Sequence, residues 1–280
     1  MKNIDLEKYN IRTDLIDDVV KSKNYYNKII KSKDVVVNRV YIDKDKSKFI
    51  KKDIGNYSTI SFNDITDSTN YEKVLNIFIK ELNYIFKRNN IGNSSSFLVL
   101  GLGNSDITPD SLGVKVSKKV IVTKHIKDLT GSLEEGYRVS SSFSPSVMGK
   151  TGIETSLVLQ NIVKIVKPDV LLVIDSLAAS DINRLSKCIQ ITDSKIGPGS
   201  GVGNNRKEIS SETIGCKIIA IGVPLVVNAN VIALSLLKKD MKKNKKLNNL
   251  VVTSVDIDFL VDKLSDLIAS GINFYIHYKK

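Results

Sequence analysis

Two aspartates, Asp110 and Asp175, stand where carboxylates could do chemistry together. Asp110 occurs in GNSDITPDSLG, just past the apolar run Ser96–Leu102, and Asp175 ends the apolar run VLLVID. If these runs are neighbouring parallel strands, both carboxylates face one crevice beyond the strands, where α/β proteins gather catalytic groups. Two close carboxylates share a proton, so the pair can activate water as a base and protonate a leaving amine as an acid. This chemistry hydrolyses peptide bonds.

Other interpretations of these aspartates stay open. Asp110 could simply stabilise a helix N-terminus through the helix dipole, and Asp175 could cap the end of its strand. A metal site built from Asp110, Asp175 and His125 is a further alternative, although the chain has only two histidines and no HExxH motif of a typical zinc peptidase. We expect no metal and no cofactor.

Three other features could carry chemistry, and a structural role is favoured for each. The glycine-rich stretch Gly197–Asn204 could cradle an anion or an oxyanion with its amides, but it is neither a P-loop nor a GxGxxG motif. Ser200 within it has no Ser-His-Asp context. Cys188 and Cys216 stand in no CxxC motif, so we expect buried thiols in a reducing compartment.

The composition is that of a folded globular protein. The 280 residues are 42% hydrophobic and 26% charged, which suits one large domain. The net charge of +12 could attract a polyanion, and the densest run, Lys238–Lys246, could form a basic patch. Because the lysines are spread along the whole chain, direct binding of nucleic acid is not favoured. No apolar run reaches the roughly 18 residues of a membrane span, so we expect a cytoplasmic protein without membrane contact.

The elements that must position the aspartates alternate in the manner of βαβ units. This pattern predicts a three-layer α/β/α fold with a mostly parallel central sheet. Residues 1 to about 20 are polar and lack a clear period, which predicts a loosely attached segment. The expected strands are Asp34–Tyr41, Ser96–Leu102, one that begins at Lys119–Val122, Val170–Ile174 and Lys217–Val223. The expected helices are Val74–Lys87, one that begins at Pro109, Glu154–Lys167 and Val255–Ala269.

Long motifs in a fixed order resemble one protein family. They are LGLGNSDITPDSLG (100–113), GYRVSSSFSPSVMGKTGIE (136–154) and KPDVLLVIDSLAA (167–179), followed by ITDSKIGPGSGVGNNRKE and IAIGVPLVV. They resemble the germination proteases of spore-forming bacteria, most strongly from about residue 97 to residue 230. The resemblance implies an endopeptidase of the forespore and spore core that begins the degradation of small acid-soluble DNA-binding proteins. It also implies a homotetramer, an inactive zymogen, no known metal and a fold related to hydrogenase-maturation peptidases.

The resemblance also assigns residues. The proposed catalytic aspartates of the family fall on Asp110 in TPDSLG and Asp175 in VIDSLA. The segment NIRTDL (10–15) resembles the self-processing site of the family, which implies a cut between Asp14 and Leu15. Residues 1–14 are then a pro-segment, and residues 15–280 form a single α/β peptidase domain with peripheral N-terminal strands and a C-terminal helix. The open alternatives are a metal-dependent peptidase on the same fold and a non-catalytic homologue that binds DNA or spore proteins.

Overall fold

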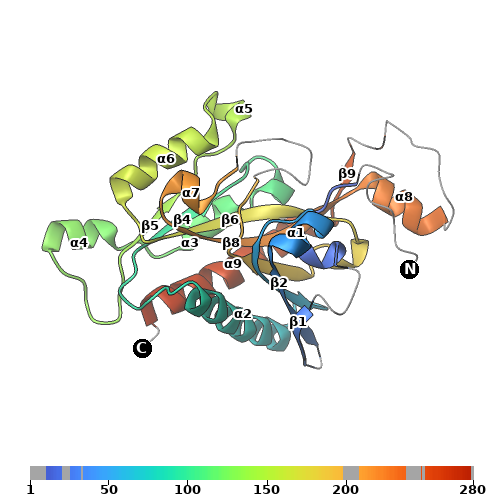
Figure 1. The fold of residues 1–280 in the computed structure, drawn as a ribbon, viewed down its shortest axis with the longest axis horizontal. Coiled ribbons are helices and arrows are strands. Elements are labelled where there is room, and N and C mark those ends of the chain that lie inside the picture. The colour runs from blue at the N-terminus through green and yellow to red at the C-terminus, as the bar shows by residue number, and fades with distance from the viewer. Residues whose placement is uncertain are drawn as a thin grey trace.

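A mixed β-sheet runs through the centre of the molecule (Figure 1). The computed structural model describes residues 11–20, 26–32, 34–197, 208–237, 247 and 250–278. Within them the sheet has nine strands in the order β1–β2–β3–β7–β8–β6–β4–β5, and β9 pairs with β8. The strands are β1 Tyr26–Lys31, β2 Val35–Ile42, β3 Gly55–Phe62, β4 Phe97–Gly101, β5 Ser140–Phe143, β6 Val170–Ala179, β7 Cys188–Thr192, β8 Lys217–Asn228 and β9 Val251–Val252.

Helices cover both faces of this sheet (Figure 1). In that view α2 and α9 lie below the sheet and α6 and α7 lie above it. The α-helices are α1 Lys44–Ile50, α2 Ser68–Arg88, α3 Leu112–Lys119, α4 Lys124–Thr130, α5 Met148–Thr151, α6 Thr155–Val166, α7 Ser211–Ile214, α8 Ala229–Leu237 and α9 Ile257–Asn273. Short 3₁₀ turns include η1 Ile16–Asp18, η3 Thr108–Asp110 and η4 Ile182–Arg184, and the π-helical turn η7 Phe274–Tyr278 follows α9.

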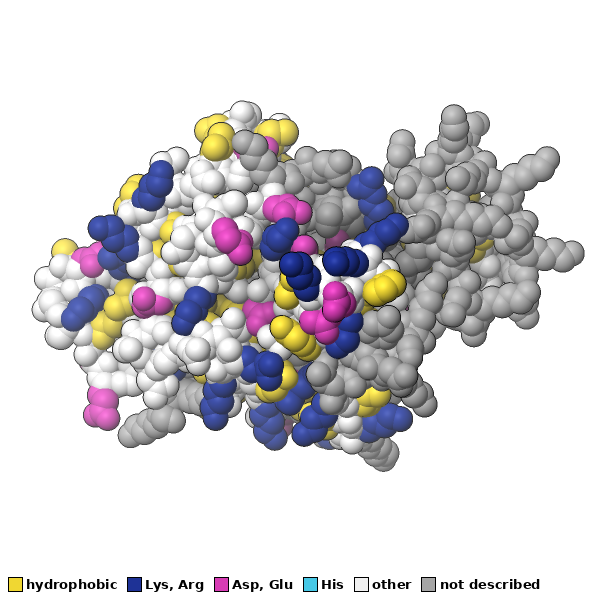
Figure 2. Space-filling view, in the orientation of Figure 1, with side chains coloured by type: hydrophobic (Ala, Val, Ile, Leu, Met, Phe, Trp, Pro, Cys, Tyr) yellow, Lys and Arg dark blue, Asp and Glu magenta, His cyan; other side chains and the backbone are white. Residues whose placement is uncertain are grey.

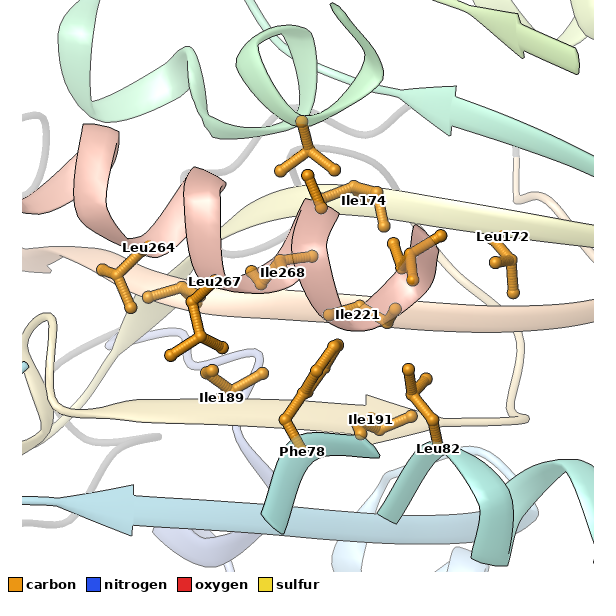
Figure 3. Close-up of a cluster of buried hydrophobic side chains, with 14 of the residues drawn as sticks. Phe78, Leu82, Leu172, Ile174, Ile189, Ile191, Ile221, Leu264, Leu267 and Ile268 are labelled. Atoms are coloured by element: carbon orange, nitrogen blue, oxygen red, sulfur yellow. The ribbon is translucent and has the colours of Figure 1, made fainter. Parts of the chain in front are cut away.

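Alternating apolar residues of the strands fill a core on each face. In β4, Phe97 and Val99 point into the larger cluster with α2, α3 and α9, whereas Leu98 and Leu100 point into the cluster with α6. Figure 3 shows part of the larger cluster, where Phe78 and Leu82 of α2 approach side chains of the strands and of α9. Because the residues at odd and at even positions of the strand are both apolar and buried, helices cover both faces of the sheet. The three-layer α/β/α fold expected from continuous apolar runs is therefore confirmed.

The direction of the strands divides the sheet into two parts. Strands β5, β4, β6 and β8 run parallel to their neighbours in that part, as expected for βαβ units. The pairs from β8 through β7, β3 and β2 to β1 are antiparallel, and so is the pair of β8 with β9. The sheet is therefore mixed, and the expected parallel order holds only for β5, β4, β6 and β8. The parallel part contains β4, which precedes Asp110, and β6, which includes Asp175. The N-terminal strands β1 and β2 extend the sheet at one edge.

Two local expectations around residue 110 are wrong. The helix expected from Pro109 is divided into the 3₁₀ turn η3 and the helix α3, because Ser111 lies between them. The strand expected at Lys119–Val122 is absent, since α3 includes Lys119 and residues 120–123 form no strand. The parallel partner of β4 is instead β5, whose sequence SSSF carries no apolar alternation that could have revealed it.

The expectation of a loosely attached N-terminus is wrong for residues 11–20. Leu15 and Ile16 are fully buried, and Ile11 and Val20 are nearly so. Ile16 and Val20 pack with Val40 of β2, whereas Leu15 packs against residues of β6, β7 and β8. These four apolar residues among polar neighbours bury enough surface to hold the segment on the sheet. The first ten residues lie outside the described part.

Several predictions concern surface features. No helix among the described residues is long and apolar enough to cross a membrane. On the face shown in Figure 2, Lys and Arg side chains lie among Asp, Glu and apolar side chains. The basic run Lys238–Lys246 and the glycine-rich stretch after Gly197, with Ser200, lie outside the described residues.

Candidate active site

Asp175 lies on the sheet itself, in the middle of β6. The sequence placed it at the end of a strand, but β6 continues to Ala179 with a register shift after Leu177. The strand can continue because β8 pairs with it over its whole length. Asp175 is half-buried, and its Oδ1 atom accepts a hydrogen bond of 2.9 Å from the backbone N–H of Ser176. Its interpretation as a strand-end cap is therefore wrong.

Asp110 is held in a tight turn that follows β4. The Asp110 carbonyl accepts a hydrogen bond of 2.9 Å from the N–H of Asn104, so the chain closes back onto the end of its strand. Gly103 makes this closure possible, because it has a φ of +111° and a Cβ atom there would collide with the Asp110 carbonyl. Asp110 itself is half-buried at the end of η3.

The two aspartates come from neighbouring strands, as the sequence argument required. In the parallel register Gly101 lies opposite Ile174, and the N–H of Leu102 donates a hydrogen bond of 2.9 Å to the Ile174 carbonyl. The turn with Asp110 therefore follows β4 at the level where β6 reaches Asp175. The first turn of α3 also packs closely here, since a Cβ atom at Gly113 would collide with the Ile174 carbonyl.

A cavity of about 130 Å³ lies over Asp175. Its floor is formed by the sheet residues Val173, Asp175, Leu177, Gln190, Thr192, Ala220, Ile221 and Gly222. Lys52, Asp53, Tyr57 and residues 194–197 supply its walls, and Asp14 of the N-terminal segment also lines it. Asp110 is not among the described residues that line this cavity. The structure thus joins Asp175 with the predicted processing site in one cavity and leaves Asp110 in the adjacent turn.

The segment with the predicted processing site lies along the end of β6. The N–H of Asp14 donates a hydrogen bond of 3.0 Å to the Ala178 carbonyl, and the N–H of Ala178 donates one of 2.8 Å to Asp14 Oδ2. Asp18 Oδ2 accepts further hydrogen bonds from the N–H and hydroxyl of Ser180, at 2.7 and 3.0 Å. Arg184 forms an ion pair of 2.9 Å with Asp18. Backbone and carboxylate contacts therefore fix the segment on both sides of Leu15.

Charged groups surround the same cavity. Lys52, which is half-buried, donates a hydrogen bond of 2.8 Å from Nζ to the Thr13 carbonyl. Burial lowers the pKa of Lys52, and the carboxylates of Asp14, Asp18 and Asp53 act in the opposite direction. Burial raises the pKa of Tyr57, whose hydroxyl donates a 2.8 Å hydrogen bond to the Asp53 carbonyl. The site thus combines a carboxylate on the floor with an ammonium group at the wall.

The remaining candidates of the sequence lie apart from this cavity. His125 is exposed in α4, and Thr123 just before that helix donates its N–H to Ser140, the first residue of β5. This is the opposite end of the parallel strands from Asp175. No group of three or more potential metal ligands occurs among the described His, Cys, Asp and Glu residues. Cys188 is buried as expected, whereas Cys216 is only partly buried. Burial raises the pKa of the Cys188 thiol to about 12 and that of Cys216 to about 11, in line with inert thiols.

Sequence reasoning missed two residues of the site, Lys52 and Gln190. Lys52 belongs to a lysine-rich turn, FIKKD, and no feature of the sequence distinguishes it from the solvated lysines nearby. Gln190 carried a usable signal, because it is a single amide inside the apolar strand CIQIT. A buried amide needs hydrogen-bond partners, and those of Gln190 lie on the N-terminal segment.

Comparisons with known proteins agree on one family. The family model described as germination protease matches residues 10–246. The germination protease of Bacillus thuringiensis subsp. konkukian (strain 97-27) is 43% identical over 240 residues, which covers 81% of this chain and 65% of that protein. The germination protease of Bacillus anthracis is 42% identical over 241 residues, which covers 81% of this chain and 66% of that protein. The chain thus spans slightly less than two thirds of the length of the curated relatives it matches.

Among solved structures, the chain is similar to a [NiFe] hydrogenase maturation protease, HycI from Thermococcus kodakarensis KOD1. The match has a TM-score of 0.33 and 15% sequence identity, and it covers 64% of this chain and 92% of that one.

Proposed function

Because the chain belongs to the germination protease family, we propose that it is an endopeptidase that begins the degradation of small acid-soluble DNA-binding proteins when spores germinate. The proposed place of action is the spore core, and the proposed assembly is a homotetramer. We further propose that the chain is a zymogen, which cuts itself between Asp14 and Leu15. Residues 1–14 are then the pro-segment and residues 15–280 the peptidase domain.

One observation carries the catalytic part of this proposal. Asp14, on the acidic side of the predicted cut, lines the same cavity as Asp175. The two residues are 161 positions apart in the sequence (175 − 14). A protease that processes itself must bring its own cut site to its own catalytic group. The cavity over β6 offers that arrangement.

The proposed reaction uses Asp175 and Asp110 as a pair that holds one proton. The ionised carboxylate removes a proton from water as the water oxygen attacks the carbonyl carbon before the cut bond. The protonated carboxyl group then donates its proton to the departing amine, the C–N bond breaks, and a new acid and a new amine are released. In the substrate, as in NIRTDL, the cut follows an acidic residue and precedes a large apolar one.

Mass spectrometry of the purified full chain, incubated with a small acid-soluble spore protein, tests this proposal. We expect the parent to lose residues 1–14 and to cut the substrate after Asp or Glu. Asp175→Asn and Asp110→Asn should each lower both rates by several orders of magnitude, because the acid and the base act as one unit. Asp106→Asn is the matched control, since Asp106 is an exposed carboxylate of the same loop that pairs with Lys150.

Three outcomes would contradict parts of the proposal. A folded parent that leaves the substrate intact would remove the protease assignment. Asp175→Asn that cuts like the parent would show that the catalytic aspartate is misassigned. Activity that is lost to a chelator and restored by a single metal ion would favour the metal-dependent alternative.

A further inference from the structure

The side chain of Gln190 contacts both sides of the peptide bond between Asp14 and Leu15. Its Nε2 atom donates a hydrogen bond of 3.3 Å to the Asp14 carbonyl, which is the carbonyl of the predicted cut. Its Oε1 atom accepts a hydrogen bond of 2.7 Å from the N–H of Ile16, the second residue after the cut. The side-chain amide of Gln190 therefore fixes the orientation of this peptide bond through one contact before the cut and one contact after it.

Gln190 also stands in line with Asp175 across the sheet. In β7 it lies opposite Gly222 of β8, and Gly222 lies opposite Asp175 of β6. Two strand spacings separate the Cα atoms of Gln190 and Asp175, which is roughly 9–10 Å. Gly222 has no side chain between them, and the space above it holds the Leu177 side chain, because a Cβ atom at Gly222 would lie 2.6 Å from that side chain. Gln190 and Asp175 thus flank one cavity from adjacent sides.

Further contacts hold the segment against the end of β6. The Thr13 carbonyl accepts a hydrogen bond from Lys52, and the N–H of Asp14 pairs with the Ala178 carbonyl of β6. Such backbone contacts are the usual way in which a sheet binds an extended peptide of varied sequence. They leave the Asp14 carbonyl directed at Gln190.

We propose that Gln190 is a catalytic residue that binds the carbonyl oxygen of the cut bond, in self-processing and in substrates cut by the mature enzyme. This inference rests on the proposed protease function. As water adds to the carbonyl carbon, negative charge develops on that oxygen, and the Nε2 hydrogen of Gln190 is in place to stabilise it. The Oε1 atom meanwhile holds the peptide beyond the cut and fixes which end of the amide faces the carbonyl.

The competing explanation is that Gln190, which is only 5% exposed, merely anchors the N-terminal segment. Asn38 offers a matched control for that role. It donates a hydrogen bond of 2.7 Å to Asp17 and so holds the same segment without contact to the cut bond. Gln190→Met removes both hydrogen bonds at nearly constant volume, whereas Asn38→Ala weakens the anchor alone.

The experiment measures the rate at which each full-length variant processes itself, and the kcat and KM of its processed form, per processed molecule, on a peptide with an acidic–apolar cut site. Gln190→Met should lower kcat on the peptide about 100- to 1,000-fold with little change in KM, as for the loss of one oxyanion donor. Gln190→Glu, which keeps an acceptor for a backbone N–H but loses the donor, should show a similar loss. Asn38→Ala should keep the kcat of the parent. Thermal unfolding of each variant checks that it is folded.

The outcomes separate this inference from the proposed function. If the parent cuts the peptide and Gln190→Met cuts it with the same kcat, the role of Gln190 is refuted while the protease function stands. An equal loss of kcat in Asn38→Ala and Gln190→Met would also refute it, because anchoring would then explain both. If the parent cuts nothing, both the function and the inference fall.

Discussion

Gly113→Ala is expected to disturb catalysis without touching either candidate aspartate. Gly113 lies in the first turn of α3, three residues after Asp110, where the helix packs directly on the ends of β4 and β6. A Cβ atom at Gly113 would lie 2.6 Å from the Leu102 nitrogen and closer still to the carbonyl oxygens of Leu102 and Ile174. All three neighbours are backbone atoms of the sheet, so the helix rather than a side chain must move.

The size of the effect follows from these distances. An ordinary contact begins at 3.4 Å, so the shortest separations must grow by most of an ångström. Overpacking of this kind destabilises a protein by about 1–3 kcal/mol, which lowers the Tm of a chain of this size by roughly 2–12 °C. A displacement of about 1 Å in a catalytic group lowers the rate about 100-fold. Because α3 carries the turn of Asp110 with it, we expect kcat to fall by that factor.

The assay combines thermal unfolding with the rates of self-processing and of peptide cleavage. Gly149→Ala in α5 is the control, since a Cβ atom there meets nothing within 4 Å. We expect this control to match the parent in Tm and in kcat. If Gly113→Ala also matched the parent in both, the close contact between α3 and the sheet would not position Asp110, and our reasoning would be wrong.

Two further predictions concern stability. Arg39 forms an ion pair with the buried Glu81 through two hydrogen bonds, of 2.8 and 2.7 Å. Glu81→Ala should therefore lower the free energy of unfolding, measured in urea, by about 3–5 kcal/mol. A loss below about 1 kcal/mol would mean that the pair contributes as little as a surface ion pair. Burial lowers the pKa of His277 below its usual 6.5. As the pH falls below about 6.5, His277 is therefore protonated in the unfolded chain before it is protonated in the folded chain, and the free energy of unfolding should decline. His277→Gln should flatten that decline in urea titrations between about pH 7.5 and about pH 5.5, and an unchanged slope would assign the decline to another group.

Much of the layered core could be predicted from the sequence. Continuous apolar runs such as Phe97–Gly101 bury both faces of a strand, so their pattern alone indicated a sheet between helices. The short strand Ser140–Phe143 could not be found in this way, because it pairs with β4 through its backbone and its serine hydroxyls donate to the carbonyls of Ile121 and Ser117, well before it in the sequence. The antiparallel half was also missed in part, since its order depends on contacts between residues far apart in sequence.

The candidate site was predictable only where a local pattern marks it. Asp110 and Asp175 each follow a recognisable apolar run, and the strands that contain these runs are neighbours as expected. Gln190 and Lys52 gain their significance from the N-terminal segment that lies across them. That segment is polar on average, so its composition concealed the buried Leu15 that holds it in place.

The full burial of Leu15 has a consequence for the direction of the proposed cut. Leu15 packs against Ala179, Cys188 and Val227, where it has no exposed surface. A cut before it would turn a neutral amide into an ammonium and a carboxylate, and burying such an ion carries a penalty of several kcal/mol. The two new ends, formerly joined by a bond of about 1.33 Å, would also have to separate to at least about 2.7 Å. Hydration would then draw the new ends apart, and the severed segment would have no tendency to rejoin, so the molecule could pass through this step only once.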